Sequence, residues 1–159
     1  MMPPDRLAAY KGPGFFCVLS QPDDSLPVQE YHHWYNTEHG PARLKLQNFS
    51  TGFRYKSRGK EPPVWLACYE LKRVSGLTDP QYTALRKQRS EREYHVLKRM
   101  KYTDRRIYTK IFQPCSCQNH LRPFLIVTMD VRSDRVDEVD EWYEEVRHIL
   151  ACGGGDGLK

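Results

Sequence analysis

Two β-strand segments that follow each other directly in the middle of the chain narrow the possible folds more than any other feature. Residues 49–57 alternate between apolar and polar side chains, which is typical of a strand with one buried face. Residues 64–71, VWLACYEL, are apolar on both faces, which indicates a strand that is covered on both sides. The polar residues 58–62 between them supply a turn, so we expect a β-hairpin.

One strand and one helix are predicted before the hairpin. Residues 14–20 form a short run rich in β-formers. From residue 27 to about residue 39, apolar positions recur every three or four residues, which indicates an amphipathic helix. We expect Gly40 and Pro41 to end this helix, because glycine suits the left-handed cap and proline has no N–H to continue the hydrogen-bond ladder.

One helix and one strand are predicted after the hairpin. Residues 77–100 have sparse apolar positions at helical spacing, with Asp79 as the N-cap. Their charged stretch RKQRSERE is interpreted as a solvent-exposed face. Residues 105–112 are interpreted as a fourth strand. The order β-α-β-β-α-β over residues 14–112 predicts an α+β fold of the ferredoxin-like type, with two helices on one face of a four-stranded sheet.

The other face of this sheet would be left open. Both faces of the predicted strands carry apolar side chains, so an open face would expose an apolar surface to water. Pairing of two copies of the chain, sheet against sheet, would cover this surface. We therefore expect a homodimer.

The remaining residues divide into a leader and a C-terminal part. Residues 1–13 contain three prolines and a glycine and are expected to be a flexible leader. Residues 113–122 are interpreted as a polar linker and residues 153–159 as a disordered tail. Residues 123–152 are predicted to form a strand and then a helix, which repeats the opening β-α order. This incomplete second repeat indicates either a decoration of the domain or a shortened form of a two-repeat protein.

Charge and cysteine content restrict the partners and the compartment. The net charge is +5, but basic and acidic residues alternate in 86–106, so nucleic acid is not expected as a partner. Attraction of anionic small molecules is as compatible with this charge, and the bland interpretation is a basic-leaning surface. Five cysteines, an odd number, and the absence of a signal-peptide pattern indicate a reducing compartment, and we expect a cytoplasmic protein. No stretch approaches the roughly 18 apolar residues of a membrane span, so no membrane partner is expected.

Residues 31–43, YHHWYNTEHGPAR, concentrate aromatic and titratable side chains more densely than any other segment. Tyr31, Tyr35 and His39 fall on the inward face of the predicted helix. The helix dipole favours a charged histidine at a helix C-terminus by about 0.3–1 kcal/mol, and such a histidine can act as general acid or base near neutral pH. His39 is therefore the first catalytic candidate. The simpler interpretation is a histidine that caps the helix end through a backbone carbonyl.

The neighbours of His39 supply the other candidates. Glu38 is the second catalytic candidate, although a surface carboxylate or an ion pair with Arg43 is the simpler interpretation. Arg43 could otherwise bind a carboxylate or phenolate oxygen of a ligand. Aromatic side chains could wall a substrate pocket with Arg43, and each of them could equally be plain core. These substrate-binding candidates are Tyr31, Trp34, Tyr35, Tyr55 and Trp65.

No metal or organic cofactor is predicted. His32 and His33 are adjacent, and neighbours on a helix point roughly 100° apart. Cys115, Cys117 and His120 offer three possible zinc ligands without a fourth at a recognised spacing. No phosphate-binding glycine loop or dinucleotide fingerprint is present in the sequence.

The motif W-Y-x-x-E-H at residues 34–39, followed by P-A-R at residues 41–43, resembles the signature of EthD-like proteins of the fungal type. The stretches PVWLACYEL, SEREYHVLKRM and DRRIYTKIF are also similar to the corresponding segments, so the resemblance covers about residues 14–112. It implies membership of the dimeric α/β-barrel superfamily, which includes cofactor-free monooxygenases, lactone isomerases, polyketide cyclases and haem-handling proteins. The founding EthD member is associated with an ether-degrading oxidation system.

Three functions are compatible with these observations. The resemblance implies first a cofactor-independent oxidoreductase, of the monooxygenase type, that acts on an aromatic or polyketide-like compound of secondary metabolism. The second is a lyase, cyclase or dehydratase that uses His39 as general acid or base. The third is a non-catalytic ligand-binding or stress-related protein.

Overall fold

A computed structural model describes residues 4–59, 61–109, 131–135, 137–139 and 141–145. The chain divides into two compact units, Met1–Lys110 and Ile111–Lys159, and each is described by itself.

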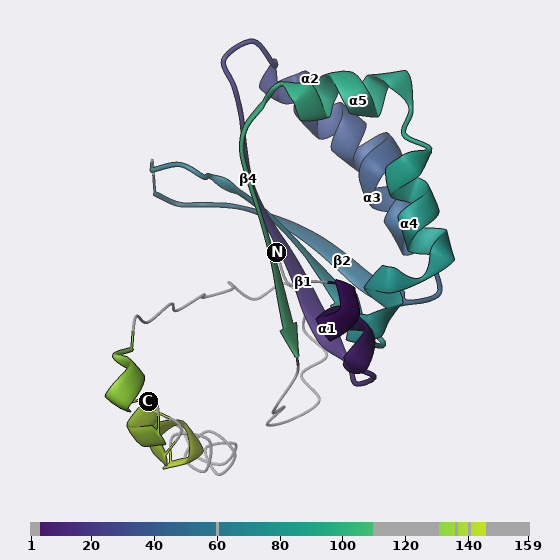
Figure 1. The fold of residues 1–159 in the computed structure, drawn as a ribbon. Coiled ribbons are helices and arrows are strands. Elements are labelled where there is room, and N and C mark those ends of the chain that lie inside the picture. Colours follow the sequence, from purple (N-terminus) through teal and green to yellow (C-terminus); the bar gives the residue numbers. More distant parts are fainter. Residues whose placement is uncertain (1–3, 60, 110–130, 136, 140, 146–159) are drawn as a thin grey trace, which may run out of the picture. The chain divides into compact units, whose positions relative to one another are not determined.

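The first unit contains an antiparallel four-stranded sheet (Figure 1). The strands are β1 (Gly14–Pro22), β2 (Phe49–Lys56), β3 (Trp65–Leu71) and β4 (Met100–Thr109). Their order across the sheet is β2-β3-β1-β4, so β1 lies between β3 and β4. This is the ferredoxin-like arrangement, and the predicted α+β fold class is confirmed.

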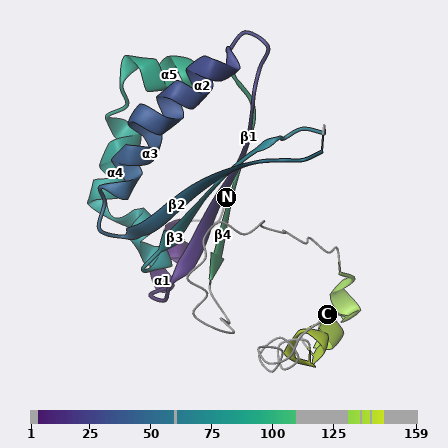
Figure 2. The same ribbon diagram turned by 180° about the vertical axis from the view of Figure 1, so that it is seen from behind.

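The helices that follow β1 and β3 lie together on one face of this sheet, as the two opposite views show (Figures 1 and 2). The segment after β1 consists of α2 (Val28–Trp34), the π-helical η1 (Tyr35–His39) and α3 (Gly40–Leu44). The segment after β3 consists of the 3₁₀ helix η2 (Val74–Thr78), α4 (Pro80–Lys87) and α5 (Glu91–Lys98).

The predicted end of the first helix at Gly40 and Pro41 is wrong, because the helix continues through both residues to Leu44. Gly40 has helical dihedral angles, φ −65° and ψ −54°, and its N–H donates to the carbonyl of Tyr35, five residues back. This wider π turn accommodates Pro41, which cannot donate the ordinary helical hydrogen bond. A side chain at position 40 would place its Cβ 3.0 Å from the Tyr35 carbonyl oxygen, so glycine permits the close approach.

The single helix predicted over residues 77–100 is also wrong, because it is divided into α4 and α5. α5 begins after Ser90, whose hydroxyl accepts a hydrogen bond of 2.9 Å from the backbone N–H of Glu93. Ser90 and Glu93 have the spacing of a capping box, which marks a helix start inside the stretch that we interpreted as a continuous exposed face. β4 then begins at Met100, earlier than the predicted start at residue 105.

The segment before β1 differs from the expected flexible leader, because it contains the helix α1 (Pro4–Ala9). Leu7 of this helix is buried. The backbone N–H groups of Val74 and Ser75 donate to the carbonyls of Gly12 and Tyr10, at 2.9 and 2.8 Å. The segment is therefore packed against η2.

The strand register settles which side chains face the helices. Val18 of β1 lies opposite Ala67 of β3, and both belong to the buried core. Arg54 of β2 also pairs with Ala67 and shares this face. Its neighbour Tyr55 pairs with Leu66 and therefore lies on the opposite, open face.

The open face of the sheet carries an apolar surface that the first unit covers only in part. The facing pair Cys17 and Cys68 is buried, whereas Tyr102 and Tyr108 are exposed. The half-buried apolar side chains on this face are Phe15, Leu19, Phe53, Tyr55 and Leu66.

The described part of the second unit contains the 3₁₀ turn Ser133–Arg135 and helical residues 137–139 and 141–145. The predicted linker, the predicted strand up to residue 130 and the predicted tail lie outside the described residues. Among the helices that the structure describes, none is long and apolar enough to cross a membrane.

Candidate functional site

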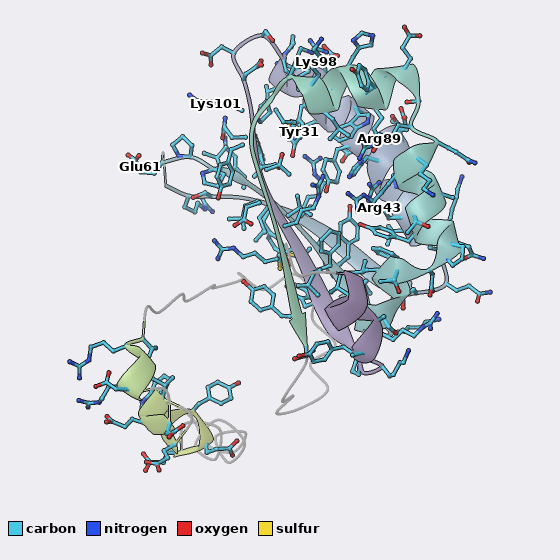
Figure 3. The ribbon with its side chains drawn as sticks, viewed as in Figure 1. Tyr31, Arg43, Glu61, Arg89, Lys98 and Lys101 are labelled. Carbon is cyan, nitrogen blue, oxygen red and sulfur yellow. The ribbon has the colours of Figure 1, made fainter. Side chains whose placement is uncertain are left out.

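A pocket opens between the helix-facing side of β1 and β4 and the helices opposite them. Its enclosed cavity is small, about 30 Å³, and the empty space reaches about 540 Å³ only when the solvent at its open mouth is included. Three aromatic side chains of the predicted set, Tyr31, Trp34 and Tyr35, line it together with His39 and Arg43. Figure 3 shows Tyr31 and Arg43 in the space between helices and sheet. A concave, largely aromatic wall with a few converging polar groups is the usual form of a small-molecule site.

His39 is held in this pocket by a carboxylate from the opposite helix. Its Nδ1 lies 3.0 Å from Oε1 of Glu93 in α5, and the two residues are only 8% and 7% exposed. Because a carboxylate only accepts hydrogen bonds, Nδ1 carries the proton and donates it to Glu93. Nε2 is then left with its lone pair, and it forms no hydrogen bond with any residue that the structure describes.

Burial and nearby cations keep His39 neutral. Burial is the largest effect, and with the positive charges of Arg43 and Arg105 it lowers the pKa of His39 to about 4, against the opposing effect of Glu93. Burial also works to raise the pKa of Glu93, but the hydrogen bond from His39 and the charge of Arg43 outweigh it and hold that pKa below its usual value. At neutral pH the pair is therefore a neutral imidazole that donates to an ionised carboxylate.

Arg43 braces the end of the π-helical turn. Its Nη1 donates a hydrogen bond of 2.7 Å to the carbonyl oxygen of His39, and its Nη2 lies 3.8 Å from Oε1 of Glu93. Arg43 is itself buried. The same guanidinium thus holds the backbone of His39 and the carboxylate that orients its ring.

Glu38 does not take part in this arrangement. Its Oε1 accepts a hydrogen bond from the hydroxyl of Ser90, and its Oε2 lies 4.0 Å from Nη1 of Arg92. The side chain is absent from the lining of the pocket. Successive residues on a helix point in different directions, so Glu38 connects the π turn to the start of α5 while His39 faces the sheet. The ion pair considered between Glu38 and Arg43 is replaced by the contact of Arg43 with Glu93.

Two predicted aromatic wall residues lie outside the pocket. Tyr55 is on the open face of the sheet. Trp65 faces the helices but packs behind the pocket, with its ring centre 6.2 Å from that of Tyr31 and 4.4 Å from that of His32.

Arg54 lies on the other side of the tyrosines and fixes them in place. Its guanidinium carbon lies 4.1 Å from the ring centre of Tyr35 and 5.1 Å from that of Tyr31. The hydroxyl of Tyr69 donates to that of Tyr35 at 3.2 Å, and burial raises the pKa of Tyr35 well above its usual value. Tyr35 is therefore a neutral wall residue at physiological pH.

Sequence reasoning missed the charged residues that come from the second helical segment and from β4. Glu93, Arg86 and Arg89 lie in the stretch interpreted as exposed, and Arg105 was assigned only to a strand. The capping-box spacing of Ser90 and Glu93 was the available signal for a helix start at this point. No local pattern indicated that Glu93 meets a histidine 54 residues away.

The described residues contain no group of three or more side chains suited to hold a metal ion. His32 and His33 contact different arginines, Arg54 and Arg92. The possible zinc ligands Cys115, Cys117 and His120 lie outside the described residues.

Fold and pocket together define a ferredoxin-like α+β protein with a buried histidine–carboxylate pair beside a small, aromatic-walled pocket. No protein-family model matches the chain, and no curated protein matches it. A DABB family protein with a ferredoxin-like fold from Mesorhizobium loti is a structural neighbour, with 8% identity and a TM-score of 0.47 over 64% of this chain and 100% of that chain.

Two further solved structures are similar to part of this chain. A dimeric ferredoxin-like protein of unknown function from Thermobifida fusca has 7% identity and a TM-score of 0.45 over 64% of this chain and 94% of its own. An ethyl tert-butyl ether (EthD) family protein from Bacillus halodurans has 13% identity and a TM-score of 0.43 over 62% of this chain and 98% of its own.

Proposed function

We propose that this protein is an enzyme that removes a proton from a small aromatic or polyketide-like molecule, with His39 as the general base. The observation that carries the proposal is the buried hydrogen bond of 3.0 Å between His39 Nδ1 and Glu93 Oε1. This bond selects the tautomer whose Nε2 can accept a proton, and the carboxylate stabilises the imidazolium that forms. Glu93 is a positioning residue, since it acts through His39.

The proposal extends to membership of the EthD-like family of the fungal type. It is supported by the W-Y-x-x-E-H motif, whose Trp34, Tyr35 and His39 line one pocket. Glu38 and Pro41 of the same motif do not line the pocket; Glu38 bonds Ser90 and Pro41 lies in the first turn of α3.

Proton removal leads to two different reaction classes. A carbanion or enolate that expels a leaving group or attacks a carbonyl in the same molecule gives a lyase, dehydratase or cyclase. An enolate that reacts with molecular oxygen gives a cofactor-independent monooxygenase, with oxygen as the oxidant. Oxygen uptake during turnover separates the two, because only the monooxygenase consumes it.

The general base is tested with simple carbon acids in place of the natural substrate. Aryl ketones and 1,3-diketones exchange their acidic C–H protons for deuterium, and NMR follows this exchange in the presence of the protein. We expect His39→Gln to slow the catalysed exchange by about 10²–10⁴-fold. The control is His95→Gln, which changes an exposed histidine of α5 and should leave the rate unchanged. Equal rates for His39→Gln and the wild type would refute the proposal.

The non-catalytic alternative has a distinct outcome in the same assay. If these compounds bind in the pocket and shift the NMR signals of its residues, but the protein does not accelerate exchange, the chain is a ligand-binding protein.

We also propose that two copies pair through the open face of the sheet. The half-buried apolar side chains on that face, such as Leu19, Phe53 and Leu66, support the proposal because a partner would remove them from water.

A further inference from the structure

We propose that the pocket recognises an aromatic carboxylate, and that Arg105, Arg86, Arg89 and the indole N–H of Trp34 bind its carboxylate group. The proposal uses the pocket of the proposed function and adds the chemical class of its ligand. Binding can be measured without turnover, so the two proposals can fail separately.

The first support is an excess of positive charge around the pocket. Four arginines line it, namely Arg43, Arg86, Arg89 and Arg105, whereas Glu93 is the one acidic residue among the described lining residues. Glu93 is already engaged by His39 and Arg43. The other three guanidinium groups are therefore available to an anion, which arginine binds through paired N–H donors.

These three guanidinium groups have no protein partner among the residues that the structure describes, by hydrogen bond or ion pair. They come from three places: Arg86 from the last turn of α4, Arg89 from the loop before α5, and Arg105 from the middle of β4. Arg86 and Arg89 are exposed at the mouth, and Arg105 is half-buried deeper in the pocket. Figure 3 shows Arg89 on the helical side of the space between helices and sheet.

Arg105 is held in an unfavourable environment in the unliganded protein. Burial lowers its pKa, the nearby Tyr82 opposes this in part, and the positive charges of Arg86, Arg43 and Arg89 lower it further. Such an arrangement destabilises the charged form, and an anion placed among the guanidinium groups would relieve it. This is the opposite of a structural arginine, whose charge is matched within the fold.

The second support is an unpaired donor. Nε1 of Trp34 is a buried N–H without a hydrogen-bond partner among the described residues, in a side chain that is only 1% exposed and lines the pocket. A buried donor without an acceptor is unfavourable, and an incoming oxyanion would supply the acceptor. The ring centre of Trp34 lies 4.4 Å from that of His39, so a ligand bound there lies beside the proposed base.

The walls indicate the remainder of the ligand. Tyr31, Trp34 and Tyr35 present aromatic surfaces beside the charged groups, which favours a flat ring attached to the carboxylate. The carboxylate would also offset the charges of Arg43 and Arg105, which contribute to the low pKa of His39. Binding of the anion should therefore make His39 a stronger base.

Matched neutral and anionic probes test the proposal on the full-length chain. Isothermal titration calorimetry compares benzoate with benzamide, which has nearly the same shape without the charge, and with inorganic phosphate. We expect benzoate to bind at least 10-fold more tightly than either. Equal affinities for benzoate and benzamide would overturn the role of the arginines. Phosphate binding as tight as benzoate would overturn the aromatic part of the proposal.

The variant Arg105→Gln separates a ligand-binding arginine from a structural one. We expect it to weaken benzoate binding at least 10-fold while its melting temperature stays equal or rises, because repulsion with the other arginines is removed. Arg58→Gln is the control, since Arg58 is an exposed arginine in the hairpin turn. A lower melting temperature with unchanged benzoate affinity would assign Arg105 a structural role and refute the proposal.

The indole N–H is tested by Trp34→Phe, which keeps a ring but removes the donor. We expect Trp34→Phe to lower the affinity for benzoate several-fold without a similar loss for benzamide. An equal loss for both probes would indicate altered packing and would count against a role of the indole N–H. If benzoate binds the wild-type protein as expected but His39→Gln exchanges protons at the wild-type rate, the general base fails alone. If benzoate does not bind while the exchange that depends on His39 is intact, the carboxylate proposal fails alone.

Discussion

Replacement of Glu93 by glutamine tests the electrostatic core of the site, because it removes a charge and keeps the shape of the side chain. Oε1 of Glu93 lies 3.8 Å from Nη2 of Arg43, a distance at which opposite charges attract by about 4 kcal/mol at an effective dielectric constant of 20. The cost of burying the carboxylate offsets part of this attraction. The bond to His39 also changes from a charge-assisted to a neutral one, a loss of about 1 kcal/mol. We expect Glu93→Gln to lower the free energy of unfolding by about 2–4 kcal/mol.

Urea denaturation at pH 7, followed by tryptophan fluorescence, measures this loss. The control is Glu91→Gln, the same change in the same helix at an exposed side chain whose contact is a distant ion pair with His95. We expect the control to alter the free energy of unfolding by no more than about 0.5 kcal/mol. A loss for Glu93→Gln as small as that of the control would show that Glu93 is not a buried partner of His39 and Arg43.

Three further predictions concern acid stability, strand packing and assembly. His39 has a pKa of about 4 in the folded protein against an ordinary value of 6.5, so between these pH values the unfolded chain binds a proton that the folded chain does not. The free energy of unfolding should therefore fall between pH 7 and pH 4, by about 3 kcal/mol more in the wild type than in His39→Gln. Urea denaturation at both pH values measures this difference. Gly14→Ala would place a Cβ 2.7 Å from the backbone oxygen of Tyr108 and should lower the melting temperature, whereas Gly12→Ala, with no atom within 4 Å, should not; equal melting temperatures would contradict the packing of β1. Leu66→Glu, on the open face, should shift the protein from dimer to monomer in size-exclusion chromatography with light scattering, and an unchanged elution would contradict pairing through this face.

Strand–helix order was readable from local periodicity. The alternation in residues 49–57 and the apolar run in residues 64–71 each predict a strand from neighbouring side chains, and the structure has β2 and β3 at these places. Helical spacing placed Tyr31, Tyr35 and His39 on one inward face, and all three are buried. These features depend on interactions within a few residues, so the chain determines them segment by segment.

Local sequence patterns gave the wrong helix boundaries at two places, one where a helix continues and one where a helix is divided. Gly40 and Pro41 indicate a helix end, yet a π turn carries the helix past them because the Gly40 N–H reaches the carbonyl of Tyr35. The reverse error occurred at Ser90, where an exposed-looking charged stretch contains a helix start. A single tertiary contact joins these two places, because the hydroxyl of Ser90 at the start of α5 donates a hydrogen bond to Glu38 in the π turn.

The amino-acid sequence by itself determined the β-α-β-β-α-β order, the ferredoxin-like fold class and the inward direction of His39. Only the tertiary structure decided that Glu93, and not the adjacent Glu38, is its partner, and that Arg54 rather than Tyr55 faces the helices. The physical reason is that periodicity reports the direction of a side chain relative to its own helix or strand. Which residue of a distant segment meets that side chain depends on strand register and helix packing, and these are set by the whole fold.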